Sequence, residues 1–191
     1  MIKASLYDRT LIVALLSASF DDNLSVNYII QQGEGRKRHI RALMDYSFEI
    51  CLMFGEVWLS ADKNACALVL YPDRKRVTLK SIWLDIKLIW NSVGIKGISK
   101  VLNREALIKN KQPEMPMYYL WFIGVNPLSQ HNGAGSKLLT TLLERAKGQG
   151  RPVFLETSAL KNLPWYKRFG FSIYDQLELD YTLFFLNNIP A

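Results

Sequence analysis

The sequence is poor in the side chains that bind metals and form disulfides. It has two cysteines, Cys51 and Cys66, and two histidines, His39 and His131, among 191 residues. The cysteines lie in apolar surroundings without the spacing of metal ligands, and the histidines are far apart. We therefore expect neither a disulfide framework nor a bound metal.

A long hydrophobic run is also missing. The apolar run from Leu11 to Leu16 is short, and Asp8 interrupts the basic flank that a secretory signal would have. Leu15 and Ala18 instead continue the face of a helix. No stretch reaches the roughly 20 apolar residues needed to cross a bilayer. The expectation is a cytoplasmic protein without a membrane partner.

The composition is that of one folded domain. Hydrophobic residues make up 49% of the chain and charged residues 21%, and no repeat, linker or low-complexity segment divides residues 1–191. The net charge of +7 favours an anionic partner. Nucleic acid, an acidic membrane and a phosphorylated cofactor all satisfy that description, so charge alone does not choose among them.

The first half predicts a helix followed by a hairpin. Apolar residues recur every three or four positions from about Arg36 to Met53, and Gly55 is placed to end that helix. Residues 56–60 and 65–71 are short, apolar and rich in strand-forming residues, with turn-type residues between them. An antiparallel sheet is expected to begin there.

The segment from residue 74 to 111 is strongly basic, with ten Lys or Arg residues against two acidic ones. Its apolar residues, Ile82, Trp83, Ile86, Ile89, Trp90 and Val93, followed by a second set from Ile98, have helical spacing. This pattern is typical of two helices that turn the aromatic stripe to the core and a basic face to solvent. A nucleic-acid surface is the alternative, but no known binding motif accompanies it.

The second half alternates strands and helices. Residues 117–125 form a nine-residue run without a charge, which predicts a strand covered on both faces. A helix over about 135–148, a strand over 152–157, a short helix over 163–169 and strands over 171–174 and 181–186 follow. The chain is therefore expected to have a mixed α/β (α+β) fold.

The loop between the predicted central strand and the next helix has the chemistry of a phosphate site. Gly133 and Gly135 allow the backbone to approach a ligand closely. The unpaired N–H groups of the first helical turn, at the positive end of the helix dipole, then suit a pyrophosphate. The Gly-Lys-Ser/Thr of a Walker loop and the third glycine of a dinucleotide fingerprint are both missing.

Gln130-x-x-Gly133-x-Gly135 after a Val-x-Pro strand end resembles the acetyl-CoA motif of the GNAT superfamily of N-acetyltransferases. The resemblance continues, in the correct order, through 154–158 and 162–171, and covers about Tyr118 to Tyr174; residues 20–72 resemble more loosely an uncharacterised, bacterial-type branch. It implies a central, mixed and mostly antiparallel sheet that is splayed at its middle strands and flanked by helices. It also implies acetyl-CoA as the acyl-donor cosubstrate.

The resemblance assigns cofactor contacts to a set of residues on the central strand, the loop, the helix start and the following segment: Ile123, Gly124, Val125, Gln130, His131, Asn132, Gly133, Ala134, Gly135, Ser136 and Asn162. Where the family has a glycine or arginine and a basic residue after the glutamine, this chain has His131 and Asn132. A protonated His131, Lys137, Lys167 or Arg168 can supply the missing charge.

The resemblance also implies catalytic roles. Tyr166 matches the tyrosine that protonates the departing thiolate, and this role is preferred to the alternative of an aromatic packed between Trp165 and Phe169. Glu156 can accept the proton of the amine, directly or through water, or form a structural ion pair. Asn162 either hydrogen-bonds the CoA arm or caps a helix.

The sequence leaves the roles of Gly124 and of three aromatic residues open. Gly124 suits a bulge or a close backbone approach to the pantetheine arm, or simply sheet packing. The aromatic residues Tyr118, Tyr119 and Trp121 either line the acceptor pocket or belong to the buried core.

The expected function is acetyl transfer from acetyl-CoA to a primary amine of a small molecule, by direct attack in a ternary complex. The alternatives are a CoA-binding sensor or scaffold domain without turnover, and a basic nucleic-acid-binding module. The preferred hypothesis includes no nucleic-acid partner. It does not decide whether the protein is a monomer or a homodimer. The basic surplus favours an acidic acceptor.

Overall fold

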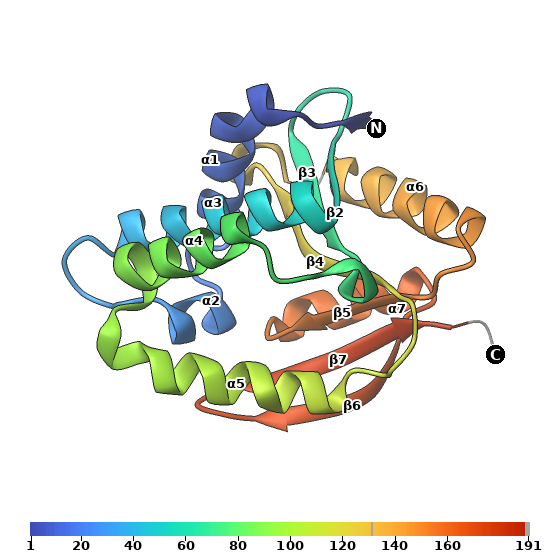
Figure 1. The fold of residues 1–191 in the computed structure, drawn as a ribbon. Coiled ribbons are helices and arrows are strands. Elements are labelled where there is room, and N and C mark those ends of the chain that lie inside the picture. Colours follow the sequence, from blue (N-terminus) through green and yellow to red (C-terminus); the bar gives the residue numbers. More distant parts are fainter. Residues whose placement is uncertain (131, 190–191) are drawn as a thin grey trace.

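The structure, a computed structural model, describes residues 1–130 and 132–189 and is built on one seven-stranded sheet (Figure 1). The strand order is β1-β2-β3-β4-β5-β7-β6, and among the described strands only β4 and β5 pair in parallel. The strands are β1 (Ile2–Lys3), β2 (Gly55–Leu59), β3 (Ala65–Leu70), β4 (Tyr118–Val125), β5 (Val153–Thr157), β6 (Ser172–Glu178) and β7 (Thr182–Asn188).

Helices cover both faces of the sheet (Figure 1). α1 and α3 share one core with Leu68 and Phe122, whereas α6 packs Leu139 and Leu142 against Tyr118 on the other face. The helices are α1 (Arg9–Ser19), α2 (Leu24–Ile29), α3 (Arg36–Phe54), α4 (Leu79–Leu88), α5 (Ile98–Lys111), α6 (Ala134–Gly148) and α7 (Leu163–Arg168). This is the mixed, mostly antiparallel α/β fold expected from the sequence.

Two helices between β3 and β4 extend the layer that contains α3. α4 packs on α3, and the Tyr46 hydroxyl donates to Asp85 at 2.7 Å. α5 lies along the last two strands, where Ile108 packs with Leu183 and Phe185 (Figure 1). The two helices thus cover the region where β4 and β5 separate.

The middle of the sheet is splayed. β4 and β5 pair only at Tyr118 with Val153 and at Tyr119 with Phe154. Beyond these positions β5 pairs with β7 alone, and the second half of β4 keeps β3 as its only strand partner among the described residues. The separation leaves one edge of β4 without a neighbouring strand.

A β-bulge sits where the splay begins. Phe122 opposes Leu68 and Leu120 opposes Val69, so Trp121 is the extra residue of β4. As a result Trp121 and Phe122, although consecutive, both pack against the core on the side of α1 and α3. The bulge therefore lies at Trp121, and the prediction that Gly124 provides one is wrong, because Gly124 pairs regularly with Cys66.

The predicted orientation of α4 is also wrong. The helix forms as expected, but it turns Ser81 and Leu84 to α3 and leaves Trp83 63% exposed. Trp90, in the π-helical turn Ile89–Val93 that follows α4, is 76% exposed. The stripe that the sequence assigned to the core therefore faces solvent in large part. The short elements α2 and β1 were not predicted, because six and two residues are too few to show a periodicity.

Gly55 ends α3 as predicted, but in an extended conformation with φ of −162° rather than a left-handed one. The chain passes directly from α3 into β2 at this residue. A Cβ atom on Gly55 would lie 1.9 Å from the carbonyl oxygen of Val69. Close pairing with β3, and not a helix cap, requires glycine here.

Candidate active site

The separation of β4 from β5 opens two adjoining cavities. The first, of about 720 Å³, lies between the end of β4, the start of α6 and the segment that leads into α7. The second, of about 450 Å³, lies between the two strands and the layer of α2, α3 and α5. Phe20, Asn23, Ile123, Asn162 and Tyr166 line both cavities. The two spaces therefore meet at these residues.

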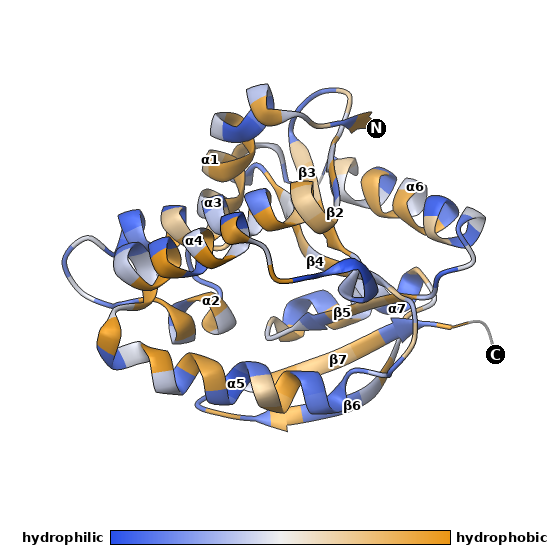
Figure 2. Cartoon of the chain, in the orientation of Figure 1, coloured by the Kyte–Doolittle hydropathy of each residue, from blue (hydrophilic) through white to orange (hydrophobic). Residues whose placement is uncertain are grey.

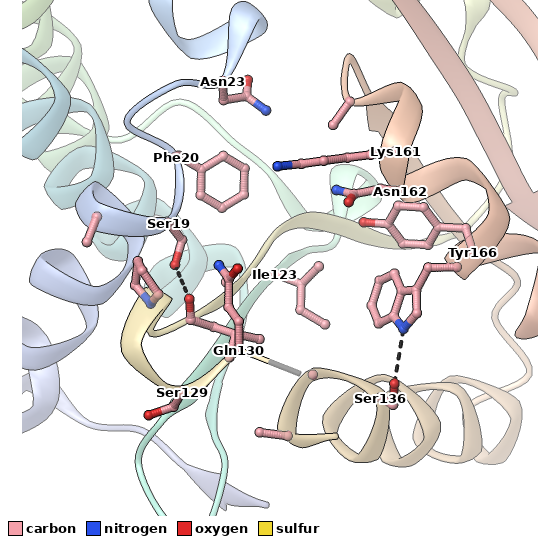
Figure 3. A pocket seen from close by; sticks show the side chains of 18 of the residues that line it. Ser19, Phe20, Asn23, Ile123, Ser129, Gln130, Ser136, Lys161, Asn162 and Tyr166 are labelled. Carbon is pink, nitrogen blue, oxygen red and sulfur yellow. Dashed lines mark hydrogen bonds between the residues drawn. The ribbon is translucent and has the colours of Figure 1, made fainter. Parts of the chain in front are cut away.

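The close view of the first cavity shows which walls supply its polar groups (Figure 3). Asn162 and Tyr166 project from one wall, near Lys161, which extends toward Phe20 and Asn23 on the other.

The direction of the β4 backbone groups follows from the β3 ladder. The N–H of Asn126 donates to the carbonyl of Asn64 at 2.8 Å, and Gly124 opposes Cys66 two positions along. Hydrogen-bonded and non-bonded pairs alternate in an antiparallel ladder, so Gly124 directs its N–H and C=O toward β3. The residues on either side of Gly124 direct theirs toward the edge that β5 has left.

Ile123 and Val125 consequently present their backbone to the first cavity, which both residues line. The carbonyl of Val125 already accepts a hydrogen bond from the Ser19 hydroxyl of α1 at 2.7 Å (Figure 3). The backbone of Ile123 is thus the best placed to pair with an amide of an extended ligand.

Gly124 lines the same cavity, but its lack of a side chain is explained by packing. A Cβ atom there would lie 2.9 Å from Cδ2 of Leu16 and 3.1 Å from Oγ of Ser19. The glycine therefore admits α1 close to the sheet, which places Ser19 on the carbonyl of Val125.

The N-terminus of α6 points its free N–H groups at the first cavity. The cap residue, Gly133, has a φ of 77° and no side chain caps the helix, while the N–H of Lys137 makes the bond to the carbonyl of Gly133 at 2.9 Å. The N–H groups before Lys137 have no intrahelical acceptor. A Cβ atom on Gly135 would lie 2.9 Å from Cγ2 of Val125, so this glycine lets the helix start against the end of β4. The arrangement is that of an anion site.

α7 is joined to the first turn of α6. Nε1 of Trp165 donates to Oγ of Ser136 at 3.0 Å, and Trp165 stacks at a tilt on Tyr166 with ring centroids 4.8 Å apart. The anion site and the tyrosine thus belong to one packed unit.

Most of the predicted cofactor residues come together around the first cavity, which is lined by Ile123, Gly124, Val125, Gln130, Gly133, Ala134, Gly135, Ser136 and Asn162. Asn132 does not line it, and His131 lies outside the described residues. Of the predicted cations, Arg168 lines the cavity, whereas Lys137 and Lys167 do not. Lys161 lines it as well, and no sequence pattern indicated this because the direction of its side chain depends on the turn before α7.

Tyr166 is 5% exposed, and its hydroxyl makes no hydrogen bond with another described residue, although it is not sealed from the cavity. Burial raises the pKa of Tyr166 above its usual range. The phenol therefore keeps its proton at neutral pH and is free to donate it to a group at the junction of the two cavities.

Asn162 is the cap residue of α7, yet its side chain makes no capping hydrogen bond. It also lines both cavities. The alternative role of a helix cap is thus not realised in this structure, and the amide can meet a ligand.

Glu156 lies in the second cavity at the splayed part of β5. One carboxylate oxygen accepts from Nε2 of Gln112 at 2.9 Å, and the other accepts a short hydrogen bond from the Tyr119 hydroxyl. Burial raises the pKa of the Glu156 carboxyl and outweighs these two hydrogen bonds, which lower it. The carboxylate makes no ion pair among the described residues, so the structural ion pair considered from the sequence is not formed.

The second cavity is mainly apolar, and its charges nearly balance. Its charged lining residues are Lys75, Asp85, Arg104, Glu105 and Glu156. Arg104 is bound by Glu105 at 2.5 Å, by the hydroxyl of Ser25 at 2.6 Å and by that of Tyr181 at 3.1 Å. Its charge is therefore already neutralised and is not available to an acidic ligand. Trp121 and Tyr119 line this cavity, whereas Tyr118 is buried on the opposite face of the sheet.

Comparison with known proteins supports this geometry. Residues 101–171 match the Acetyltransferase (GNAT) family. An uncharacterized N-acetyltransferase from Schizosaccharomyces pombe is 35% identical over 76 residues, which are 40% of this chain and 30% of that protein. The match thus spans less than a third of the relative's length.

Solved structures match over nearly the whole chain. A histone acetyltransferase HPA2 and related acetyltransferase from Corynebacterium glutamicum superposes with a TM-score of 0.75 at 19% identity, covering 100% of this chain and 95% of the other. Arylalkylamine N-acetyltransferase 2 from Aedes aegypti gives a TM-score of 0.62 at 16% identity, with 97% and 96% covered. At these identities the likeness shows the fold.

The chain, with its splayed mixed sheet and the open N-terminus of α6 at the end of β4, therefore shares the fold of these solved acetyltransferases. The match to the Acetyltransferase (GNAT) family thus covers residues 101–171, and the likeness of fold to solved acetyltransferases extends over nearly the whole chain. None of the helices in the described ranges is long and apolar enough to span a membrane, and residues 1–130 and 132–189 bring together no group of three metal-binding side chains.

Proposed function

We propose that the protein transfers an acetyl group from acetyl-CoA to a primary amine by direct attack in a ternary complex. The observation that carries this proposal is the junction of the two cavities at Tyr166. One cavity ends at the free N–H groups of α6 and the other ends at the Glu156 carboxylate. A donor and an acceptor that enter from opposite sides would meet beside the buried phenol.

The residues around the first cavity, from here on the cofactor cavity, fit the parts of acetyl-CoA. The first turn of α6 binds the pyrophosphate, with Lys161 and Arg168 near its charge. The backbone of Ile123 pairs with the pantetheine arm, and Asn162 contacts the same arm. When bound, the thioester supplies the acyl group.

Two side chains move the protons in this proposal. Tyr166 donates its phenolic proton to the departing sulfur. Because its pKa is raised, the phenol still carries this proton at neutral pH. Glu156 accepts the proton of the amine, through water where the amine does not reach it. The hydrogen bonds from Tyr119 and Gln112 hold the carboxylate in position.

The second cavity, from here on the acceptor cavity, suits a small amine with an apolar body. Trp121, Phe122 and Val26 supply apolar surface, and Glu156 supplies a negative group near the junction. Because Arg104 is neutralised by Glu105, the cavity does not favour the acidic acceptor that the net charge suggested.

Calorimetric titration with acetyl-CoA tests the cofactor site, using three variants of α6 glycines. Gly133→Glu puts a negative side chain at the anion site, Gly133→Ala tests the strain at positive φ alone, and Gly148→Glu puts the same charge at the other end of the helix, where a Cβ atom also meets nothing within 4 Å. We expect Gly133→Glu to lose binding while the two controls retain it. Equal binding by all four proteins would place the cofactor elsewhere.

A CoA-binding domain without turnover is the second possibility. It is favoured by one observation: β4 has no carboxylate, the group that many members of the GNAT superfamily use as the base on this strand. An assay of CoA thiol release with a panel of small amines separates the enzyme from the binding domain. Binding of acetyl-CoA without thiol release in the presence of any of the amines supports the domain without turnover.

A further inference from the structure

The outer face of α4 carries an apolar stripe that the active site does not explain. Ser81 and Leu84 of this helix are buried, and the stripe lies on the opposite side. Figure 2 shows apolar residues along α4. Its members in α4 and their exposed fractions are Leu79 (89%), Ile82 (44%), Trp83 (63%) and Ile86 (53%), and Trp90 (76%), in the π-helical turn Ile89–Val93 that follows α4, continues it.

No described part of the chain covers this stripe. The cofactor and acceptor cavities, and a third small cavity between α3 and α4, are lined by other residues of the segment. Substrates bound in the active site would therefore leave the five side chains exposed. A contiguous row of this kind on a surface marks a docking site.

The stripe lies in the part of the chain that carries the positive charge. Residues 74–111 hold ten basic and two acidic residues, a surplus of eight, whereas the whole chain has a net charge of +7. The rest of the protein is therefore slightly acidic, and the charge is concentrated around α4 and α5.

Two kinds of cation border the stripe. Lys80 and Lys87 on one flank pair with Glu49 and Asp45 of α3, at 2.8 and 3.4 Å, and fix the helix in place. Lys75, Arg76 and Lys96, at the two ends of the stripe, are exposed and form no ion pair with a described acidic residue. These free cations can therefore meet an external anionic surface.

We propose that α4 docks on an anionic phospholipid bilayer, with Trp83 and Trp90 at the boundary of headgroups and acyl chains and with Arg76 and Lys96 against lipid phosphates. Tryptophan and leucine or isoleucine on one face, with lysine and arginine around them, is the composition of a helix that lies in the membrane interface. Lys75 lies both beside the stripe and at the acceptor cavity, so the docked face adjoins that cavity. This inference does not depend on the proposed function, and it departs from the expectation, drawn from the sequence, of no membrane partner.

The bordering charges argue against a second copy of the chain as the occupant. A symmetric dimer would place one stripe on the other and bring the free cations of both copies together. Asp85, the acidic residue of α4, is already engaged by the Tyr46 hydroxyl. An anionic lipid surface meets both features of the stripe, its apolar side chains and its cations.

Cosedimentation with vesicles tests the proposal. We expect the wild type to bind vesicles of phosphatidylcholine with phosphatidylserine about tenfold better than phosphatidylcholine alone, and added salt to reduce the difference. Trp83→Ser combined with Trp90→Ser should lower binding to both vesicles by about tenfold or more. Arg76→Gln combined with Lys96→Gln should remove mainly the preference for the anionic vesicles.

Tyr7→Ser is the matched control, because Tyr7 is an aromatic residue that is 99% exposed and lies outside α4. Circular dichroism and acetyl-CoA titration verify that the Trp83/Trp90 variant is folded. Failure of the wild type to bind the anionic vesicles, or equal binding by the Trp83/Trp90 variant, overturns the proposal. A lipid-free dimer in sedimentation velocity that this variant converts to a monomer overturns it as well, in favour of a second copy.

Discussion

The cofactor cavity and the acceptor cavity meet at Tyr166 but are lined by different kinds of groups. The cofactor cavity relies on backbone and on glycines: the free edge of β4, the first turn of α6, and Gly135 packed against Val125. The acceptor cavity relies on side chains from α2, α3, α5 and both splayed strands. In the proposed function, backbone groups hold the cofactor and side chains select the acceptor.

A buried carboxylate paired with an arginine fixes the cofactor side of the molecule. Arg145 of α6 pairs with both carboxylate oxygens of Glu56 on β2, at 2.5 and 2.7 Å, and Trp58 and Tyr118 donate to the same carboxylate. Burial raises the pKa of Glu56, but the hydrogen bonds and charge of Arg145 outweigh it and leave that pKa below its usual range. This pair holds the helix whose N-terminus forms the anion site.

The largest effect should come from breaking that pair. Arg145→Leu leaves the Glu56 carboxylate buried without its cation, and we expect the free energy of unfolding to fall by about 3 kcal/mol. A lowered native pKa stabilises the fold above the ordinary carboxyl range, and this contribution is lost as the pH falls through the native value. The loss should therefore be larger near about pH 7 than near about pH 3 in denaturant titrations.

The double variant Glu56→Gln with Arg145→Met is the control for this prediction, because it removes both charges and should recover most of the stability. An Arg145→Leu protein as stable as the wild type would show that the cofactor side does not depend on the pair.

The next effect concerns the junction of the cavities. Tyr166→Phe removes the proton donor but keeps the ring between Trp165 and Phe171, and we expect kcat to fall by about 100-fold. The affinity for acetyl-CoA should not change, which titration of the same variant measures. Unchanged kcat would assign Tyr166 to packing alone.

A smaller effect is expected on the acceptor side. Glu156→Gln should lower kcat/KM by about tenfold, because water can still accept the proton of the amine. Since Glu156 must be ionised to act, the rate of the wild type should rise with pH through a value above the ordinary 4.5 of a glutamate. The pH profile of the variant should lack this rise in rate. If the variant keeps the rise, a group other than Glu156 is the base.

The smallest effect should separate packing from ligand contact at Gly124. Gly124→Ala brings a methyl group close to Leu16, and we expect a loss of about 1 kcal/mol in the free energy of unfolding. Because the backbone of Gly124 faces β3, the affinity for acetyl-CoA should stay within about threefold of the wild type. A large loss of affinity with unchanged stability would reverse this assignment.

The cofactor side was largely predictable from the sequence. The uncharged run of β4, the glycines at 133 and 135 and the segment 162–171 are local patterns, and each formed the element expected of it. The cations near the first turn of α6 were harder to predict from the sequence, since Lys161 lines the cavity and Lys137 does not. Side-chain directions at a turn depend on how neighbouring helices pack.

The acceptor side was less predictable. Helical spacing indicated α4 and α5, but the same spacing does not say which side of a helix meets the protein, and the aromatic stripe of α4 proved to be exposed. The neutralisation of Arg104 by Glu105, Ser25 and Tyr181 joins residues far apart in the chain. No local pattern reports such a contact.

By itself the sequence determined the order of the central elements, the glycines at the start of α6 and the place of Tyr166 in α7, because each depends on residues close together in the chain. The resemblance also implied a splay of the middle strands. Only the tertiary structure decided where β4 separates from β5, the bulge at Trp121, the balance of charge in the acceptor cavity and the outward face of α4. These features arise from contacts between distant segments. Burial of the whole core sets the register of these strands and the side that each helix turns to the protein.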